Sequence, residues 1–532
     1  MRVILEVLHP NPPDVKFVVE PGSEFADDLG PSIVEQGYKL LSWREATSTR
    51  FDVVLAAHAT QALGEFRGPV FCLPHGAGYN RLVPESTGSP DFATGTVDSQ
   101  LKAESGSVIP AAFGCSHPEQ LERLRKSCPE AVDRAVVIGD PVYDQICASR
   151  RRRPEYRDRF EVGPDQKLVV VISTWGKHGT VGCEANLPMR LLAQLPADEY
   201  RVLLIMHPNI WAGHSVAQIR SELRNELDSG LVVIPPRTPW AAGLIAADIV
   251  LGDHSSLSMY AAAIGCRFLL AADGRPELVP GSPLANLCAE ATRLDVHGDL
   301  RAQIEDHLQA PRQRSAKEIA DTIFAEQGQS WARTRSVVRK LVGREDLSEP
   351  PRMTAVGDPE PDSGRRVTSW QVSVTMDGRT GTVRLERYPL IAREQFPELE
   401  RLSQVSDDAE VDQRTRENSE ALVRTQPCGK SEGEEWLVEV LNPTVGGDAG
   451  RLVHSEARNI GVAAYRHATG CVVQWCDGLR VETDAVDAFA AAVVLHEMYT
   501  SGETLESPGR VRYSARPGEF AEFSHGGATM PS

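Results

Sequence analysis

The sequence predicts an α/β protein made of two doubly wound domains of Rossmann type, followed by a smaller α+β domain. Up to about residue 345, short and nearly continuous Val/Ile/Leu runs alternate with helical stretches. Such runs are typical of parallel strands that are covered on both faces of the sheet. An arginine-rich break at 150–153 divides this alternation into two blocks, and residues 347–366 are rich in proline, glycine and acidic residues, as linkers are. We therefore predict domains at 1–150, 151–346 and 367–532, with a linker at 347–366.

Each domain is predicted from its own strand and helix pattern. The strands expected in the first block are Val3–Leu8, Phe51–Ala56, Val70–Leu73, Val108–Ala112 and Val136–Ile138. Those expected in the second block are Leu168–Ile172, Val202–Met206, Leu231–Ile234, Ile249–Leu251 and Phe268–Leu270. A helix at 330–343 is expected to close the second block.

In the third domain, alternating apolar residues from Trp370 to Leu385 around Asp377-Gly378 predict a hairpin. We expect further strands at 436–442 and 471–478. A helix is expected over Asp484–Thr500, with Gly502 as its stop. The third domain has no chemical motif that we can name.

Composition limits the classes of function. The 532 residues carry a formal net charge of −18, which disfavours binding to nucleic-acid phosphates. No apolar run reaches the roughly 18 residues that span a bilayer. The ten cysteines form no CxxC pair, so we expect reduced thiols, a cytoplasmic location and no metal or other cofactor. The arginines near residue 150 allow at most peripheral contact with the inner membrane face.

The stretch 247–272 contains the strongest candidate for a binding site. A buried strand ends at Asp253-His254-Ser255-Ser256 and leads directly into an alanine-rich helix. The amino end of a helix carries unpaired N–H groups and a positive partial charge, which together suit a diphosphate. The alternative is that the two serines only cap a core helix.

Four further segments place polar residues at the ends of predicted strands. They carry His207 before Pro208, His75 before Gly76, Asp140 in a tight strand exit, and Thr174 with Lys177. His207 and His75 are each open to a structural alternative, and Asp140 by itself marks only a turn. A histidine accepts a proton near neutral pH, so His75 is also a candidate base.

Taken together, these motifs resemble the bacterial CDP-glycerol glycerophosphotransferase family, the teichoic-acid-type polymerases and primases. The matching elements are His75-Gly76, Gly139 with Pro141 and Asp144, Ser173-Thr174-Trp175, His207-Pro208 and Asp253-His254-Ser255-Ser256. The resemblance covers roughly residues 50–300 and implies a GT-B fold, in which two Rossmann-like domains face each other across a cleft. The sequence departs from the family's pattern at His254, where a Tyr is usual, and by lacking a lysine after His75-Gly76, where Arg81 is the nearest cation. The third domain is also foreign to that pattern.

The resemblance implies a transferase that moves a polyol-phosphate or glycosyl group from a nucleotide-diphosphate donor to a hydroxyl acceptor. The acceptor would be a glycan or a lipid-linked polymer. His75 would act as the base and His207 would contact the diphosphate. The nucleotide side would comprise Thr174, Lys177, Asp253, His254, Ser255 and Ser256, and the acceptor side Gly76, Arg81 and Asp140. The alternatives are a nucleotide-sugar glycosyltransferase, a UDP-sugar epimerase of GT-B fold, and a non-catalytic protein that binds a nucleotide or glycan.

Overall fold

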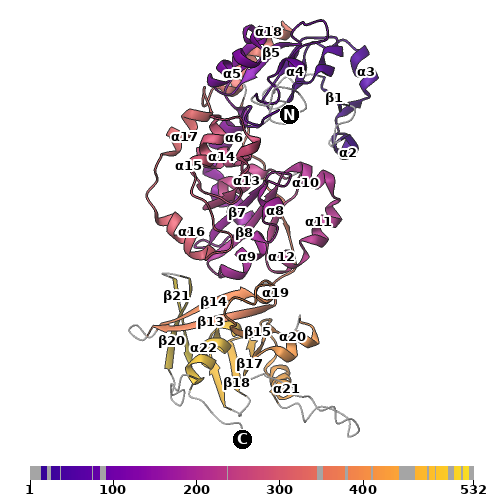
Figure 1. The fold of residues 1–532 in the computed structure, drawn as a ribbon. Coiled ribbons are helices and arrows are strands. Elements are labelled where there is room, and N and C mark those ends of the chain that lie inside the picture. Colours follow the sequence, from indigo (N-terminus) through magenta and orange to yellow (C-terminus); the bar gives the residue numbers. More distant parts are fainter. Residues whose placement is uncertain are drawn as a thin grey trace.

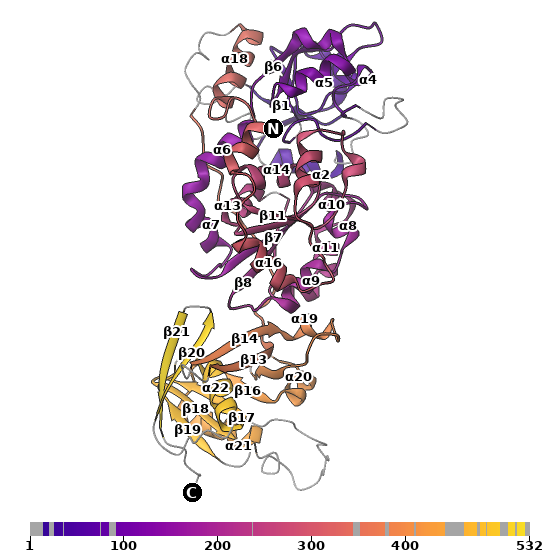
Figure 2. The ribbon, with the colours of Figure 1, turned by 60° about the vertical axis from the view of Figure 1, so that its left-hand side comes forward.

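The computed structural model describes three domains that are stacked in a row, with the third at the far end (Figures 1 and 2). The described residues are 14–20, 26–35, 37–74, 76–83, 92–236, 238–343, 352–377, 382–408, 411–441, 462–475, 479–485, 487–500, 509–516 and 519–526. The predicted strand Val3–Leu8, His75, Cys476 and Gly502 lie outside these residues, as does most of the predicted hairpin turn after Asp377.

The first domain is built on a parallel sheet. Its four strands lie in the order β3 (Val54–Ala56), β4 (Val70–Cys72), β5 (Pro110–Cys115) and β6 (Ala135–Val137). A separate parallel pair consists of β1 (Lys16–Val18) and β2 (Lys39–Leu41), which the sequence pattern did not predict. The helices of this part are α2 (Ala26–Glu35), α3 (Trp43–Ser48), α4 (Asp98–Leu101) and α5 (Glu119–Ser127).

The second domain contains a larger sheet in the order β11-β10-β7-β8-β9, all parallel. The strands are β7 (Lys167–Ser173), β8 (Tyr200–Met206), β9 (Val232–Ile234), β10 (Ile249–Gly252) and β11 (Arg267–Leu270). Alternate residues of β7 enter two different cores, because Val170 packs on one face of the sheet and Val169 on the other. Both faces are covered by helices, as the continuous apolar runs predicted.

The helices around this sheet are short. They are α7 (Arg153–Arg159), α8 (Thr180–Cys183), α9 (Leu187–Gln194), α10 (Pro208–Gly213), α11 (Val216–Glu222), α12 (Arg224–Asp228), α13 (Trp240–Ala246), α14 (Ser256–Ala263), α15 (Pro283–Glu290), α16 (Leu300–Gln309) and α17 (Ala316–Ile323).

Two helices cross between the first two domains. Helix α6 (Pro141–Ser149) follows the last strand of the first sheet, yet its Tyr143 and Ile146 are buried in the core of the second domain. Helix α18 (Ser330–Val342) returns in the other direction, and its Val337 and Val338 pack on the first sheet, beside β5 and β6 (Figures 1 and 2). The helix expected at 330–343 therefore exists, but it covers the first domain instead of closing the second.

The predicted linker is docked along the second domain in its described part. Val356 is buried in the core of that domain, and its carbonyl accepts a hydrogen bond from the Tyr156 hydroxyl at 2.6 Å. Farther along, β12 (Asp362–Ser363) pairs with β9 in antiparallel orientation and covers the edge of the sheet. We call residues 352–368 the strap.

The third domain is a closed barrel of nine strands in the order β13-β14-β20-β21-β19-β18-β17-β16-β15. The strands are β13 (Ser369–Asp377), β14 (Thr382–Pro389), β15 (Ser403–Asp407), β16 (Ala421–Arg424), β17 (Val462–His467), β18 (Gly470–Trp475), β19 (Arg480–Thr483), β20 (Gly509–Arg516) and β21 (Glu519–His525). Its helices are α19 (Leu390–Glu394), α20 (Gln413–Asn418), α21 (Lys430–Leu441) and α22 (Ala488–Thr500).

Helix α22 occupies the middle of the barrel, as both views show (Figures 1 and 2). Residues Ala488 to Leu495 are all buried and pack against strands around the wall, so the helix is apolar on every face. Helix α21 covers the outside of the wall, where Trp436, Leu437 and Val440 pack on Tyr465. The strand predicted at 436–442 is therefore wrong, because these apolar residues recur at helical spacing.

The third domain is fastened to the second by apolar contacts and ion pairs. Ala392 and Phe396 enter the core of the second domain. The guanidinium of Arg387 forms an ion pair with Asp198, with Nε–Oδ2 at 2.9 Å. The predicted fold class, two α/β domains with parallel sheets and a smaller α+β domain, is confirmed.

Candidate functional site

The order of strands in the second sheet creates a switch point between β7 and β10. From β7 the chain moves toward β8 and β9, whereas from β10 it moves toward β11 on the other side. The connections diverge there, so a crevice opens at the carboxyl ends of these two strands, where doubly wound folds bind ligands. The loop Thr174–Gly179 follows β7, and Asp253–Ser255 follow β10, so two of the predicted motifs meet at this crevice.

Asp253 joins the two loops from beneath. Its Oδ2 accepts hydrogen bonds from the backbone N–H groups of Thr174 at 2.7 Å and Thr180 at 2.9 Å. The side chain is fully buried, and burial raises the pKa of its carboxyl group. Asp253 thus fixes the shape of both loops.

The two serines are placed at the start of α14. Ser255 occupies the N-cap position, but its side chain makes no capping hydrogen bond to the helix. Ser256 lies against Gly76 of the first domain, where an added Cβ would come within 2.4 Å of Ser256 Oγ. Gly76 also has a φ of +72°, which favours glycine. This close approach brings the loop after β4 onto the amino end of α14, so the carboxyl edges of the two sheets face each other.

His254 points away from the crevice into the structure. Its side chain is 2% exposed, and its Nε2 lies 3.2 Å from Glu277 Oε2. The ring rests on Gly274, where any Cβ would overlap it. The imidazole therefore supports the turn from behind.

Glu277 also contacts a cationic side chain from the first domain. Arg81 forms an ion pair with Glu277, and its guanidinium stacks over the Trp175 ring at 4.6 Å. The backbone follows the same path, since Leu82 N donates to Glu277 O at 2.9 Å. Neither Glu277 nor the Arg81–Trp175 contact was predicted from the sequence, because residues 273–278 have no periodic pattern.

His207 and Lys177 border the same edge of the sheet. His207 follows β8. Its backbone N–H donates a hydrogen bond to the carbonyl oxygen of Ser173 at the end of β7, at 2.9 Å. Its Nδ1 accepts from Asn209 N at 3.1 Å, so the neutral ring carries its proton on Nε2. Lys177 is exposed on the loop after β7.

Asp140 lies behind this site at the domain junction. Its Oδ1 accepts from Val142 N and Tyr143 N, each at 2.8 Å, and its Oδ2 accepts from the Tyr260 hydroxyl at 2.9 Å. Burial raises the pKa of Asp140 to about 6. Both oxygens are thus used to start α6 and to attach it to α14. His75 lies outside the described residues, and its role stays a prediction.

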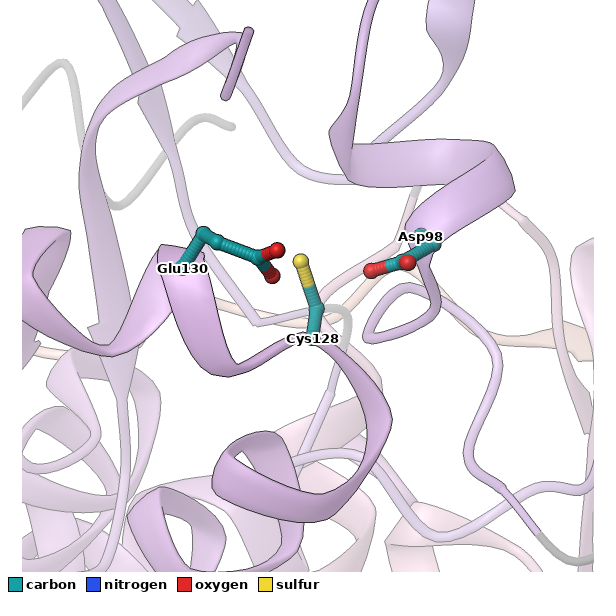
Figure 3. A group of neighbouring side chains, drawn as sticks. All are labelled: Asp98, Cys128 and Glu130. Carbon is teal, nitrogen blue, oxygen red and sulfur yellow. The ribbon is translucent and has the colours of Figure 1, made fainter. Parts of the chain in front are cut away.

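One group with the ligand types of a metal site lies elsewhere in the first domain. Figure 3 shows Cys128 between the carboxylates of Asp98 and Glu130. The ammonium group of Lys102 already forms ion pairs with both acids, at 3.0 Å and 2.9 Å. Lys102 therefore offsets part of the negative charge of the cluster and takes up carboxylate oxygens that a metal would need.

Comparison with known proteins gives structural matches only. No family model and no curated protein matches the sequence. The wall teichoic acid polymerase TagF is 14% identical over 65% of this chain and 86% of its own, with a TM-score of 0.40. The UDP complex of Staphylococcus aureus MnaA is 11% identical over 64% of this chain and 98% of its own, with a TM-score of 0.35. The UDP-GlcNAc 2-epimerase of Neisseria meningitidis bound to UDP-GlcNAc is 14% identical over 61% and 84%, with a TM-score of 0.36. Likeness this distant carries no argument about function.

In the described parts of the chain, no helix combines the length and the apolar character needed to cross a bilayer.

Proposed function

We propose that this protein is a transferase that moves a polyol-phosphate or glycosyl group from a nucleotide-diphosphate donor to a hydroxyl acceptor. The observation that carries this proposal is the switch point between β7 and β10, where Asp253 holds two loops and leaves the serines at the start of α14 facing the first domain. Anions are stabilised at such a helix start by N–H groups and the helix dipole.

The residues around the crevice have complementary roles in this proposal. The first amides of α14, with the hydroxyls of Ser255 and Ser256, hold the diphosphate. His207 offers a proton on Nε2 to a phosphate oxygen and offsets the charge that builds up on the leaving group. His75 takes the proton from the acceptor hydroxyl as the oxygen attacks the donor. Asp253 and His254 shape the site without touching the donor.

Binding of a nucleotide is tested by thermal shift. We expect CDP or UDP to raise the melting temperature of the wild type, because a ligand that binds only the folded state stabilises it. The Ser255→Ala/Ser256→Ala variant should lose this shift. Since Ser255 makes no capping bond, the unliganded variant should melt within a few degrees of the wild type. A wild type that responds to neither nucleotide contradicts the donor site.

Turnover is tested separately, by measuring nucleotide release from CDP-glycerol and from a panel of nucleotide sugars. His75→Ala should lower the rate by roughly 100- to 10,000-fold, as loss of an acid–base group does. Its nucleotide affinity should change by less than about tenfold. His207→Ala should reduce both quantities. Nucleotide binding without turnover of any donor would favour a non-catalytic binding protein.

A further inference from the structure

A cavity lies between the second and third domains, far from the crevice between β7 and β10. It has a volume of about 780 Å³ and is lined by the strap, by the amino-terminal side of the second sheet and by the barrel. This volume lies within the range of roughly 300–1,000 Å³ that is usual for small-molecule sites. Gln166, which precedes β7, lines the cavity, whereas Thr174 at the crevice follows β7. The strand between them has seven residues, so the two sites are about 20 Å apart.

The barrel contributes the ends of three parallel strands. Strands β15, β16 and β17 run parallel in this order, so their carboxyl ends lie at the same edge. Val405, Val423 and Ala464 face the barrel core, and side chains alternate along a strand. Asp407, Thr425 and Arg466 each lie two residues farther on, and all three line the cavity.

The carboxylates that line the cavity already have partners. Glu161 forms an ion pair with Arg201 at 2.9 Å, and Asp198 is paired with Arg387. Asp487 Oδ1 accepts from the first amides of α22, at 3.0 Å from Phe489 N. Asp407 accepts a hydrogen bond from the Thr425 hydroxyl.

Three guanidinium groups remain without a carboxylate. Arg365 and Arg366 lie on the strap and Arg466 on β17, and none of them forms an ion pair within the described part of the chain. Among the residues that the structure describes, the hydrogen-bond partner of Arg366 Nη2 is the Thr425 hydroxyl, at 3.4 Å. On the opposite wall, Arg201 Nε is a buried donor without a partner among the described residues. The cavity is lined by five arginines and four carboxylates, so it has a formal excess of one positive charge in a chain whose net charge is −18.

We propose that this cavity binds a small phosphorylated metabolite. Guanidinium groups match the geometry and charge of a phosphate with paired N–H donors. Arg365, Arg366 and Arg466 hold the phosphate, and the Trp370 side of the cavity takes the organic part. Because the cavity has walls from both domains and the strap, the bound ligand joins the third domain to the second. This inference does not depend on the proposed transferase activity.

The site is tested by calorimetry on the full chain with inorganic phosphate, pyrophosphate, glucose 6-phosphate and AMP. The measurements are made in the Ser255→Ala/Ser256→Ala variant, so that phosphate binding at α14 does not contribute. At least one probe should bind. The Arg365→Gln/Arg366→Gln variant should raise its Kd by about 10-fold or more, because hydrogen bonds to charged groups are lost. Arg466→Gln should act in the same direction.

Arg414→Gln is the matched control, since Arg414 is an exposed arginine on α20 of the same domain and does not line the cavity. It should leave the Kd unchanged. The two strap arginines are exposed, so their replacement tests the site even if Arg466→Gln fails to fold. Absence of binding by all four probes overturns the proposal. A Kd that stays within twofold in the strap variant also overturns it, as does an equal loss in Arg414→Gln.

Discussion

Glu277 connects side chains from three distant parts of the sequence. It contacts His254 behind the turn and Arg81 of the first domain, and Arg81 in turn stacks on Trp175. Sequence patterns identified Arg81 and His254 one at a time, as residues near motifs. They could not identify Glu277, because its importance comes only from the position of the first domain over the second.

Removing the charge of Glu277 tests this connection. Glu277→Gln keeps the shape but loses the ion pair with Arg81, so we expect the free energy of unfolding to fall by about 1–2 kcal/mol. Urea denaturation measures the change. Glu290→Gln is the control, because the Glu290–Arg314 pair is largely exposed and should contribute less than about 0.5 kcal/mol. Equal effects of the two substitutions would mean that Glu277 forms only another surface ion pair.

The buried Asp140 predicts a dependence of stability on pH. Burial raises the pKa of Asp140 from 3.8 to about 6, so between these values the folded protein binds a proton that the unfolded chain does not. Its contribution to stability therefore increases as the pH falls from 7 to 4, by about 3 kcal/mol in total.

Asp140→Asn should abolish this contribution. Asparagine can still cap α6, so the variant should be at least as stable as the wild type at pH 7. The stability of the wild type relative to the variant should increase as the pH is lowered to 4. Urea midpoints of both proteins at pH 4, 5, 6 and 7 check the sign, and parallel curves would show that Asp140 does not titrate in this range.

At the scale of elements, the sequence predicted the strands of the two parallel sheets better than it predicted the shorter strands and the helix α21. Continuous apolar runs gave four strands of the first sheet and all five parallel strands of the second. The short pair β1 and β2 was missed, since three residues carry too little pattern. The Trp and Val residues of α21 favour strands, which explains the wrong prediction there, although Trp436, Leu437, Val440 and Leu441 have helical spacing.

Helix α18 is held in the first domain by a side chain of α6. Asp144 accepts hydrogen bonds from Gly328 N at 2.7 Å and Ser330 N at 3.0 Å, just where α18 begins. Asp144→Ala leaves the buried N–H and hydroxyl of Ser330 unpaired, so we expect a loss of about 2–4 kcal/mol in the free energy of unfolding. Asp158→Ala on the exposed side of α7 is the control and should change stability by less than about 0.5 kcal/mol. Chemical denaturation of both variants measures the two losses. A loss in Asp144→Ala no larger than that in Asp158→Ala would contradict this role of Asp144.

At the scale of the whole molecule, the domains are linked by segments that leave one unit and pack on another. Helix α6 enters the second domain, α18 returns to the first, and the strap follows the edge of the second sheet. Composition alone made residues 347–366 resemble a free linker. It could not reveal that Val356 packs in a core whose other residues lie between positions 77 and 324. The motifs of the candidate site lie at the carboxyl ends of strands, so the topology of a parallel sheet is enough to predict that they lie near one another.

Truncations measure what the strap contributes. A chain ending at residue 366 keeps Val356 and β12, whereas one ending at 343 exposes the edge of β9 and leaves a hole in the core. We expect the melting temperature to decrease from the full chain to 1–366 and again to 1–343, because the third domain and the strap bury separate apolar surfaces. Differential scanning calorimetry gives the order. Identical values for the two truncated chains would mean that the strap is a passive connection.

The central helix of the barrel imposes an order of assembly during synthesis. Strands β20 and β21 follow α22 in the chain, and β20 closes the wall by pairing with β14. At the usual rates of translation, on the order of 10 s pass between the appearance of β14 and that of its last partner. Helix α22 is made shortly before the end of that interval, and until β20 and β21 follow, it lacks part of its enclosure. A released chain that ends before residue 509 therefore exposes a helix that chaperones for apolar segments would recognise, and the finished barrel does not.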